Sequence, residues 1–291
     1  MLNTLKNRFE QGYRTTKYPK VKIELPSRYR GRPQIQQDVS KDVVEQCAKN
    51  CPQDAIDAEN KMIDMGRCVF CGTCERVSKG RFVSFTQDFE ISVAKKEHLM
   101  TDGTLPSLAD HSRQHFKKLF GRSLQLRQVS AAGCNACEAD LNVLATPFFD
   151  LARFGINFVA SPRHSDGIVV TGPVSRNMKT ALLTTLEAVP DPKVVIAVGS
   201  CTLTGGPFRG SSEITESLDS LIPVDLFIPG CPPHPLTNLH ALLTYFKYNL
   251  SQKHILGSMA VLQGSEKYSH TPCMLRFFTS LCLALNPNLY F

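Results

Sequence analysis

The chain has 291 residues, of which 42% are hydrophobic and 20% are charged. These are the values of an ordinary globular protein with one or two domains, and they exclude a disordered or fibrous chain. The net charge of +7 would permit nucleic-acid binding, but no helix-turn-helix, ribonucleoprotein or zinc-finger pattern is present. We therefore expect no nucleic-acid partner, and a basic surface that docks onto acidic partner subunits explains the charge equally well.

The chain contains eleven cysteines, which is many for its size. It starts without the apolar core of a signal peptide, and clustered cysteines in such a chain more often bind metal than form disulfides. No apolar run reaches the roughly 20 residues that a membrane helix needs. The nearest candidate, 274–285, is short and contains Arg276.

The segments outside residues 123–250 differ from one another in amino-acid composition. Residues 1–35 form a basic, proline-containing arm, and 36–92 hold five cysteines among short elements. Residues 93–122 combine polar turns with a short basic helix at 108–121, which is typical of a linker. The tail, 251–291, has no recognisable pattern, and we predict no role for it.

Residues 123–250 alternate short apolar runs with helical patterns. This alternation predicts an α/β domain with a parallel sheet that helices cover on both faces. The predicted strands lie at 124–129, 156–160, 167–172, 193–199 and 224–230, and the predicted helices at 138–154, 176–189 and 235–250.

The first group of cysteines lies in the N-terminal third of the chain. Cys68, Cys71 and Cys74 have the spacing C-x2-C-x2-C, and Cys51 is followed by Pro52. Bacterial ferredoxins carry the run C-x2-C-x2-C-x3-C-P, in which the last cysteine binds the other cluster. The four cysteines therefore make one complete set of thiolates for a [4Fe–4S] cluster.

A second cluster in this segment would lack ligands. It would need cysteines at positions that hold Lys41, Val44 and Ser78, and only Cys47 remains of it. We therefore predict one cluster here, with Cys47 outside the ligand set. A zinc knuckle or a group of structural thiols is the alternative, but zinc sites usually pair cysteines in twos across a longer gap.

The second group of cysteines follows the predicted strands of the α/β segment. Cys134 and Cys137 form C-x-x-C after the first strand, and Cys201 and Cys231 each follow a later one. Open α/β sheets place their ligands at the carboxyl ends of strands, so the four thiols predict a tetrathiolate site there. The helix expected to start at residue 135 would stabilise the negative thiolates through its N-terminus. Inert core thiols, or a redox-active C-x-x-C pair, are the alternatives.

Glycines accompany these cysteines. They suit backbone that turns tightly or approaches a bulky inorganic group. They lie at positions 133, 199, 205, 206 and 230.

Four motifs between 125 and 245 resemble the small, cluster-bearing subunit of nickel–iron hydrogenases and the homologous subunit of respiratory complex I. They read GCNACEADL, SPRHSDGIVVTGPVSRNM, AVGSCTLTGGPF and LFIPGCPPHP. The resemblance implies a flavodoxin-like fold, a large partner subunit and a proximal [4Fe–4S] cluster on Cys134, Cys137, Cys201 and Cys231. The stretch around the first cysteine group resembles the ferredoxin-like subunits of formate hydrogenlyase. It implies a small α+β ferredoxin-like domain at 36–92 in front of the hydrogenase-like domain at 123–250, and two clusters in all.

The first of these motifs separates two branches of the resemblance. Complex I places two adjacent cysteines there, whereas this chain has C-x-x-C followed by Glu138, which is the hydrogenase pattern. The resemblance thus implies an electron-transfer subunit of a membrane-associated, formate-hydrogenlyase-type [NiFe] hydrogenase complex. The chain would work with further iron–sulfur and membrane subunits, in the cytoplasm on the inner face of the cell membrane. The nickel centre would lie on the large partner subunit, because this chain lacks the two further C-x-x-C pairs that it needs. A complex-I-like quinone oxidoreductase module without nickel and a non-redox zinc-binding assembly protein are the alternatives.

Three polar residues near the motifs are further candidates. The resemblance implicates the carboxylate after C-x-x-C, here Glu138, in proton transfer, whereas its spacing from Asn135 also fits a helix capping box. Arg163 and His164 would polarise the site, face a partner at a quinone-binding end, or form a surface salt bridge.

Overall fold

The computed structural model describes residues 2–21, 23–106, 108, 123–215 and 217–246. The chain divides into two units, 1–249 and 250–291, and the second lies outside the described residues. The predictions for the tail and for most of the basic helix at 108–121 therefore concern parts that the structure does not describe.

The second half of the described chain folds around a five-stranded sheet in which all pairings are parallel. Its strands pair in the order β10–β9–β8–β6–β7. Numbered along the chain, this is the 2-1-3-4-5 order of flavodoxin-like folds, so the predicted flavodoxin-like fold of this part is confirmed, whereas the ferredoxin-like fold of the first part stays a prediction. The strands are β6 (Leu124–Ser130), β7 (Ile156–Phe158), β8 (Gly167–Thr171), β9 (Val194–Val198) and β10 (Leu226–Ile228).

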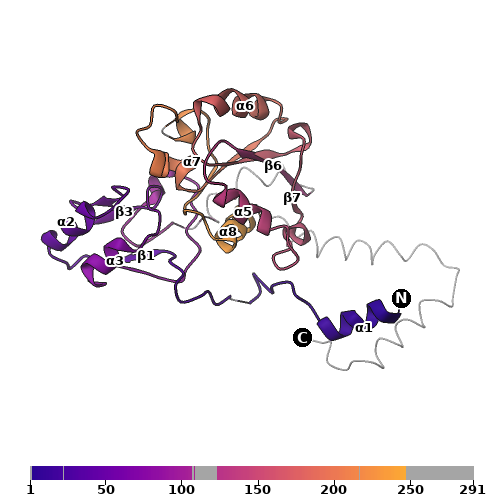
Figure 1. The fold of residues 1–291 in the computed structure, drawn as a ribbon, viewed down its shortest axis with the longest axis horizontal. Helices are drawn as coiled ribbons and strands as arrows, with labels where there is room; N and C mark the ends of the chain where they lie inside the picture. The colour runs from indigo at the N-terminus through magenta and orange to yellow at the C-terminus, as the bar shows by residue number, and fades with distance from the viewer. Residues whose placement is uncertain (1, 22, 107, 109–122, 216, 247–291) are drawn as a thin grey trace. The chain divides into compact units, whose positions relative to one another are not determined.

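Helices cover both faces of this sheet, as Figure 1 shows. The helices are α5 (Ala136–Val143) and α8 (Pro235–Phe246) on one face, and α6 (Arg176–Glu187) and α7 (Ser200–Thr204) on the other. Neighbouring residues of one strand enter different cores: Val195 packs with α6 and α7, and Ile196 with α5 and α8. Burial on both faces explains why β8 and β9 are almost entirely apolar, whereas β6 carries Gln125, Arg127 and Gln128 among its apolar residues.

The predicted helix at 138–154 is wrong in its length. Helix α5 ends at Val143, and a separate 3₁₀ turn, η3 (Leu151–Phe154), follows. Pro147 lies between them and cannot continue a helix, because it lacks the N–H and clashes with the preceding turn.

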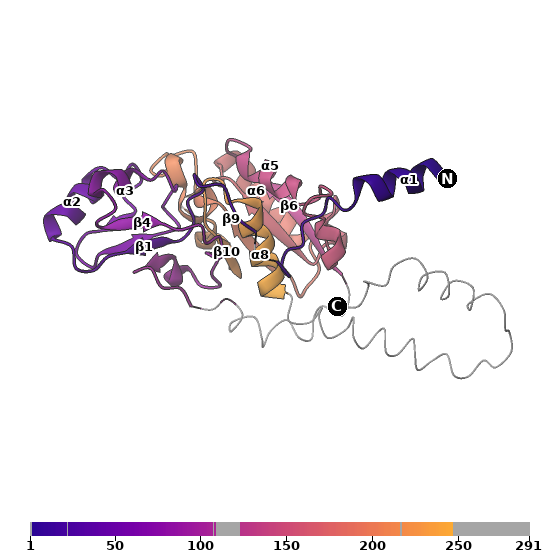
Figure 2. The same cartoon turned by 90° about the horizontal axis from the view of Figure 1, so that it is seen from below.

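The first part of the chain forms short antiparallel pairs and helices. Strand β1 (Pro33–Ile35) pairs with β4 (Val83–Phe85), and α2 (Lys41–Lys49) and α3 (Thr73–Ser78) lie on the same side of this pair (Figure 2). A second sheet is formed by β2 (Ile56–Asp57), β3 (Met62–Asp64) and β5 (Met100–Thr101). The strands of this part thus reach beyond 36–92 at both ends. A helix, α1 (Leu2–Gln11), occupies the start of the basic arm.

The two parts of the first unit share a hydrophobic core. Met65 and Leu99 pack into the cluster that covers the α6–α7 face of the parallel sheet. Val93 lies antiparallel to Phe227 of the edge strand β10, and each residue's N–H donates to the other's carbonyl, at 3.0 and 2.8 Å. Just after Val93, the turn η1 (Lys96–Leu99) carries Lys96 into an ion pair with Asp219 at 2.8 Å. The cysteine-rich part is therefore packed against the α/β part.

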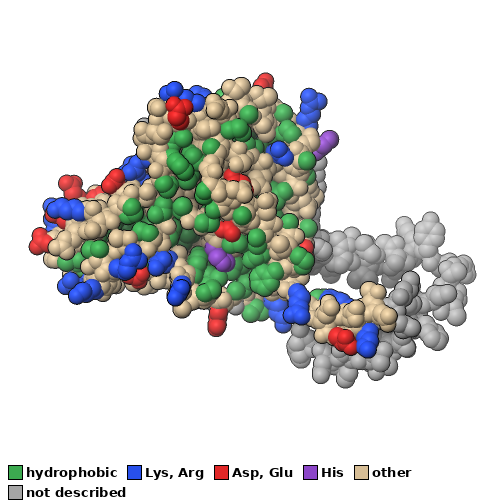
Figure 3. All heavy atoms as spheres, viewed as in Figure 1, with side chains coloured by type: hydrophobic (Ala, Val, Ile, Leu, Met, Phe, Trp, Pro, Cys, Tyr) green, Lys and Arg blue, Asp and Glu red, His purple; other side chains and the backbone are tan. Residues whose placement is uncertain are grey.

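The surface agrees with the dispersed charge of the sequence. On the face shown in Figure 3, Lys and Arg side chains are scattered, with Asp and Glu among them. Among the residues that the structure describes, none of the helices has the length and apolar character needed to cross a membrane.

Candidate metal centres

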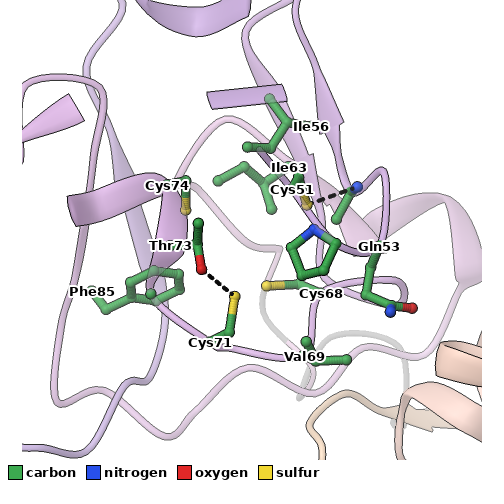
Figure 4. A pocket seen from close by; sticks show the side chains of 13 residues that line it. Cys51, Gln53, Ile56, Ile63, Cys68, Val69, Cys71, Thr73, Cys74 and Phe85 are labelled. Atoms are coloured by element: carbon green, nitrogen blue, oxygen red, sulfur yellow. Dashed lines mark hydrogen bonds between the residues drawn. The ribbon is translucent and has the colours of Figure 1, made fainter. Parts of the chain in front are cut away.

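The first group of cysteines surrounds one cavity in the small N-terminal part. Cys51, Cys68, Cys71 and Cys74 line it, and their sulfur atoms turn toward a common space of about 360 Å³ (Figure 4). The other lining side chains include Ile63 and Phe85, and no Lys, Arg or His is among them. Four thiols in an apolar cavity without a cationic side chain leave the positive charge to be supplied by a metal centre.

The backbone around this cavity is turned toward the sulfur atoms. Cys51 follows the end of α2, and Cys74 lies in α3, which begins at Thr73. The N–H of Ala55 donates to Cys51 Sγ at 3.3 Å, and that of Phe70 donates to Cys68 Sγ at 3.4 Å. Hydrogen bonds to a thiolate favour its charged form, and hydrogen bonds to cluster sulfurs set the reduction potential.

Two thiols of this site, those of Cys68 and Cys74, resist ionisation in the absence of metal. Burial, with a smaller contribution from negative charge on Cys47, Cys51 and Cys71, raises the pKa of Cys74 to about 12. Burial likewise raises the pKa of Cys68 well above its usual range. A bound cation would reverse this preference, because metal ligation requires the thiolate and releases the proton.

Cys47 lies outside the cavity. It is fully buried in the core of the small part, and its thiol donates a long hydrogen bond of 3.5 Å to the carbonyl of Cys74. Burial raises its pKa as well. This placement supports the prediction that Cys47 is a core residue and not a ligand.

The second group of cysteines lies at the carboxyl edge of the parallel sheet. Cys134 and Cys137 follow β6, Cys201 lies in α7 after β9, and Cys231 follows β10. The strand order reverses at β6, which is the switch point where such sheets bind ligands. Cys134 and Cys231 are exposed and the other two are half-buried, so the site opens to the protein surface.

The four thiols of the second site influence one another. Burial, with a smaller contribution from negative charge on Cys231 and Cys134, raises the pKa of Cys201 to about 11. Burial also raises the pKa of Cys137, helped first by Glu138 and then by the other three cysteines. The structure thus brings the four predicted ligands into electrostatic contact.

Two glycines leave room for the sulfur atoms. A Cβ on Gly199 would lie 2.6 Å from Cys137 Sγ, and a Cβ on Gly206 would lie 3.0 Å from Cys201 Sγ. Both glycines have positive φ, of +88° and +52°. Backbone that approaches thiolates this closely fits a bulky inorganic group, as the glycines of the sequence predict.

The cysteine side chains of the two sites do not form a ligand set for a single metal ion. Among the described residues, no group of three or more His, Cys, Asp or Glu side chains could hold a metal ion. The fit of a larger group therefore rests on the lined cavity of the first site and on the glycines of the second.

Glu138 is held beside the second site by residues that sequence analysis did not identify. The hydroxyls of Ser130 and Thr171 donate to Glu138 Oε1 at 2.7 and 2.6 Å. Ser130 and Thr171 lie opposite each other at the ends of the paired strands β6 and β8. Their position at the strand ends is the signal that could have identified them from the sequence. The capping alternative is wrong, because Asn135 at the helix start makes no side-chain cap and Glu138 is occupied elsewhere.

The two other polar candidates from the sequence lie at the protein surface. Arg163 and His164 are exposed on the 3₁₀ turn η4 (Pro162–His164), and their roles stay predictions. Sequence analysis missed Arg28 and Arg30 of the N-terminal arm. They line a cavity of about 730 Å³ that also borders Cys231, and so carry positive charge next to the second site.

Comparisons with known proteins agree with this geometry. Residues 134–245 match the family described as NADH ubiquinone oxidoreductase, 20 kDa subunit. The probable membrane-bound hydrogenase subunit mbhJ of Pyrococcus furiosus is 42% identical over 126 residues, which is 43% of this chain and 75% of that protein.

Two further relatives match over similar lengths. Formate hydrogenlyase subunit 7 of Escherichia coli is 40% identical over 134 residues, which is 46% of this chain and 52% of that protein. An NADH-quinone oxidoreductase subunit of a Roseiflexus species is 42% identical over 116 residues, which is 40% of this chain and 43% of that protein. The match therefore covers about half or less of these two relatives, and it lies in the α/β part. The chain belongs to the family of the 20 kDa subunit of NADH:ubiquinone oxidoreductase, whose members are iron–sulfur subunits of oxidoreductase and hydrogenase complexes.

Proposed function

We propose that this chain relays electrons between two [4Fe–4S] clusters in an [NiFe]-hydrogenase-like complex of the formate hydrogenlyase type. The four cysteines of the first cavity would hold one cluster, and the four at the sheet edge would hold the proximal cluster beside a large catalytic subunit. The observation that carries the proposal is the presence of two complete cysteine sets in one folded unit, the second of them at the switch point of a flavodoxin-like sheet.

The residues around the first cavity would set the reduction potential of a cluster bound there. A bound iron–sulfur cluster accepts and releases single electrons. Ile63 and Phe85 wall the first cavity with apolar surface, and the N–H groups of Ala55 and Phe70 are directed at the sulfur atoms of Cys51 and Cys68. Burial and such hydrogen bonds are the means by which a protein sets the potential of a cluster.

We infer from the exposure of the second site that a partner subunit covers it. Cys134 and Cys231 are exposed, so a cluster there would be in contact with solvent unless another subunit covered it. The C-x-x-C spacing and the similarity to mbhJ and to formate hydrogenlyase subunit 7 favour a large [NiFe]-type subunit in this place. Further iron–sulfur and membrane subunits would hold the complex on the inner face of the cell membrane.

A second candidate function has its own support. The family description and the Roseiflexus relative both favour a quinone oxidoreductase module of the complex I type. Such a module would keep both cysteine sites but pair them with a large subunit that lacks nickel ligands.

Anaerobic purification of the native complex, with metal analysis and identification of its subunits, tests these proposals. Of the iron in the complex, we expect each copy of this chain to account for about 8 atoms, because each of its two [4Fe–4S] clusters contributes four, and the iron of the partner subunits comes in addition. We also expect nickel and a large subunit with two C-x-x-C pairs. A large subunit without these pairs would favour the complex I type. About 4 iron atoms would leave only one cluster, and zinc in place of iron would end the electron-transfer proposal.

A further inference from the structure

Ser200 lies between the two cysteine sites. It is almost fully buried, with 1% of its surface exposed, and it immediately precedes Cys201 of the second site. Its hydroxyl donates to the carbonyl of Cys68, a residue of the first site, at 2.9 Å. One side chain thus connects the backbone of a residue in one site to the residue next to it in the other.

The position of this hydroxyl is fixed by the backbone around it. The N–H of Ser200 donates to the carbonyl of Gly230 at 2.8 Å, and Gly230 directly precedes Cys231. The hydroxyl oxygen also lies 3.1 Å from that carbonyl, but the carbonyl of Cys68 is nearer. Both carbonyls lie within hydrogen-bond distance of the one hydroxyl proton, and the shorter contact is the one to Cys68.

We propose that Ser200 is the positioning residue that couples the two sites electronically, because its hydroxyl holds the backbone of Cys68 against the peptide of Cys201. This inference rests on the proposed function, in which both sites hold clusters. The path runs from Cys68 through its carbonyl, across the hydrogen bond to the Ser200 side chain, and along the backbone to Cys201. One electron leaves the first site and one arrives at the second, and no bond is made or broken and no proton moves.

Another contact joins the same loop to the same helix without following this path. The hydroxyl of Thr204 donates to the carbonyl of Gly66 at 3.2 Å. Thr204 is half-buried on α7, as Cys201 is, but it is bonded to neither site's cysteines. The same hydroxyl also lies 3.2 Å from the carbonyl of Ser200 within α7. Thr204→Val removes both contacts but keeps the hydrogen bond from Ser200 to Cys68 and the backbone from Ser200 to Cys201, so it is the control for loss of a hydroxyl on the same helix.

The test compares three variants in the purified, fully loaded complex. Ser200→Ala removes the hydroxyl, Ser200→Thr keeps it, and Thr204→Val is the control. The first readout is the rate of electron transfer between the sites after rapid one-electron reduction of the first. The second is the magnetic interaction between the two reduced clusters in electron paramagnetic resonance. Iron content of each variant is measured alongside.

We expect Ser200→Ala to slow the transfer by roughly tenfold or more, since loss of an outer-sphere partner commonly lowers the performance of a metal site 10- to 100-fold. The magnetic interaction should weaken in the same variant. Ser200→Thr should restore both readouts, and Thr204→Val should leave them unchanged. If Ser200→Ala loses iron, the hydroxyl is needed to hold a cluster and not to couple two loaded sites, which overturns the inference even where Ser200→Thr regains the iron.

Other results would overturn the inference. Unchanged transfer in Ser200→Ala, with both clusters present, removes the role of Ser200 but leaves the proposed function standing. Equal slowing in Thr204→Val would show that any contact between the two parts matters, which also refutes a special path. Loss of iron in both Ser200 variants has the same consequence. If the unaltered protein lacks either cluster, the proposed function itself fails, and this inference fails with it.

Discussion

Replacing Gly199 by alanine is expected to empty the second site and leave the first one filled. Gly199 has φ +88° and ψ 151°, a region that only glycine adopts readily, so alanine costs about 1–3 kcal/mol in backbone strain. Its Cβ would lie 2.6 Å from Cys137 Sγ. Heavy atoms in contact normally stay about 3.5–4.0 Å apart, so the sulfur must move by about 1 Å. Functional sites tolerate displacements of only about 0.5 Å, so the four-thiolate set is broken.

Gly210→Ala is the matched control for this variant. Gly210 also has positive φ, +84°, so alanine there brings comparable strain of about 1–2 kcal/mol. A Cβ at this position meets no atom within 4 Å. Iron analysis should give about 4 iron atoms per chain for Gly199→Ala and about 8 for Gly210→Ala. Full iron in Gly199→Ala, with an unaltered spectrum of the second cluster, would refute the argument that glycine is needed there to make room for Cys137.

Three further changes have separate expected outcomes. Cys47→Ala should keep all the iron of the first site, whereas Cys51→Ala should lose about 4 iron atoms per chain, and equal losses would make Cys47 a ligand. Glu138→Gln keeps an acceptor oxygen for its two hydroxyl partners, but the amide cannot take up and release a proton as the carboxylate can. Hydrogen evolution by the complex should therefore fall by roughly 100-fold or more with both clusters retained, and unchanged turnover would exclude a proton-transfer role. Burial lowers the pKa of His234 from its usual 6.5, and the Nδ1 atom of His234 accepts the N–H of Leu236. As the pH falls below about 6.5, this histidine therefore takes up a proton in the unfolded chain before it does so in the folded chain, and the free energy of unfolding declines. Denaturant unfolding at about pH 7.5 and pH 5.5 should show this decline in the unaltered protein and a smaller one in His234→Asn, and an equal decline in both would assign it to other groups.

The α/β part could be predicted because its signals are local. Strands β8 and β9 are apolar runs that end directly before a glycine, β10 ends two residues before Gly230, and the ends of parallel strands meet at one edge. Cys201 and Cys231, thirty positions apart, could therefore be placed together from the strand pattern alone. The partners of Glu138 were harder to find, because they depend on the register between β6 and β8, which no single segment encodes.

The contacts between the two cysteine sites could not be predicted from sequence for a similar reason. The hydrogen bond from Ser200 to Cys68 joins residues 132 positions apart. It depends on how the first part packs on the second, and that packing is decided by side chains such as Met65 and Val93, which have no distinctive pattern. Residues 93–101 show the same limit. Their sequence is typical of a linker, yet they supply a strand, an ion pair and a bridge to β10.

The shared core has a consequence for electron transfer. If a flexible linker joined the two sites, their separation would fluctuate, and with it the rate of transfer. Here Met65 lies three residues before Cys68 and is fully buried in the core of the parallel sheet, so the loop that carries Cys68 is anchored to the domain that carries Cys201. In the proposed function, two clusters that are each bound by four thiolates would repel one another. Arg28 and Arg30 line the cavity beside Cys231, where their positive charge would reduce this repulsion, so the basic arm, which the sequence presents only as a charged segment, would stabilise negative charge next to the second site.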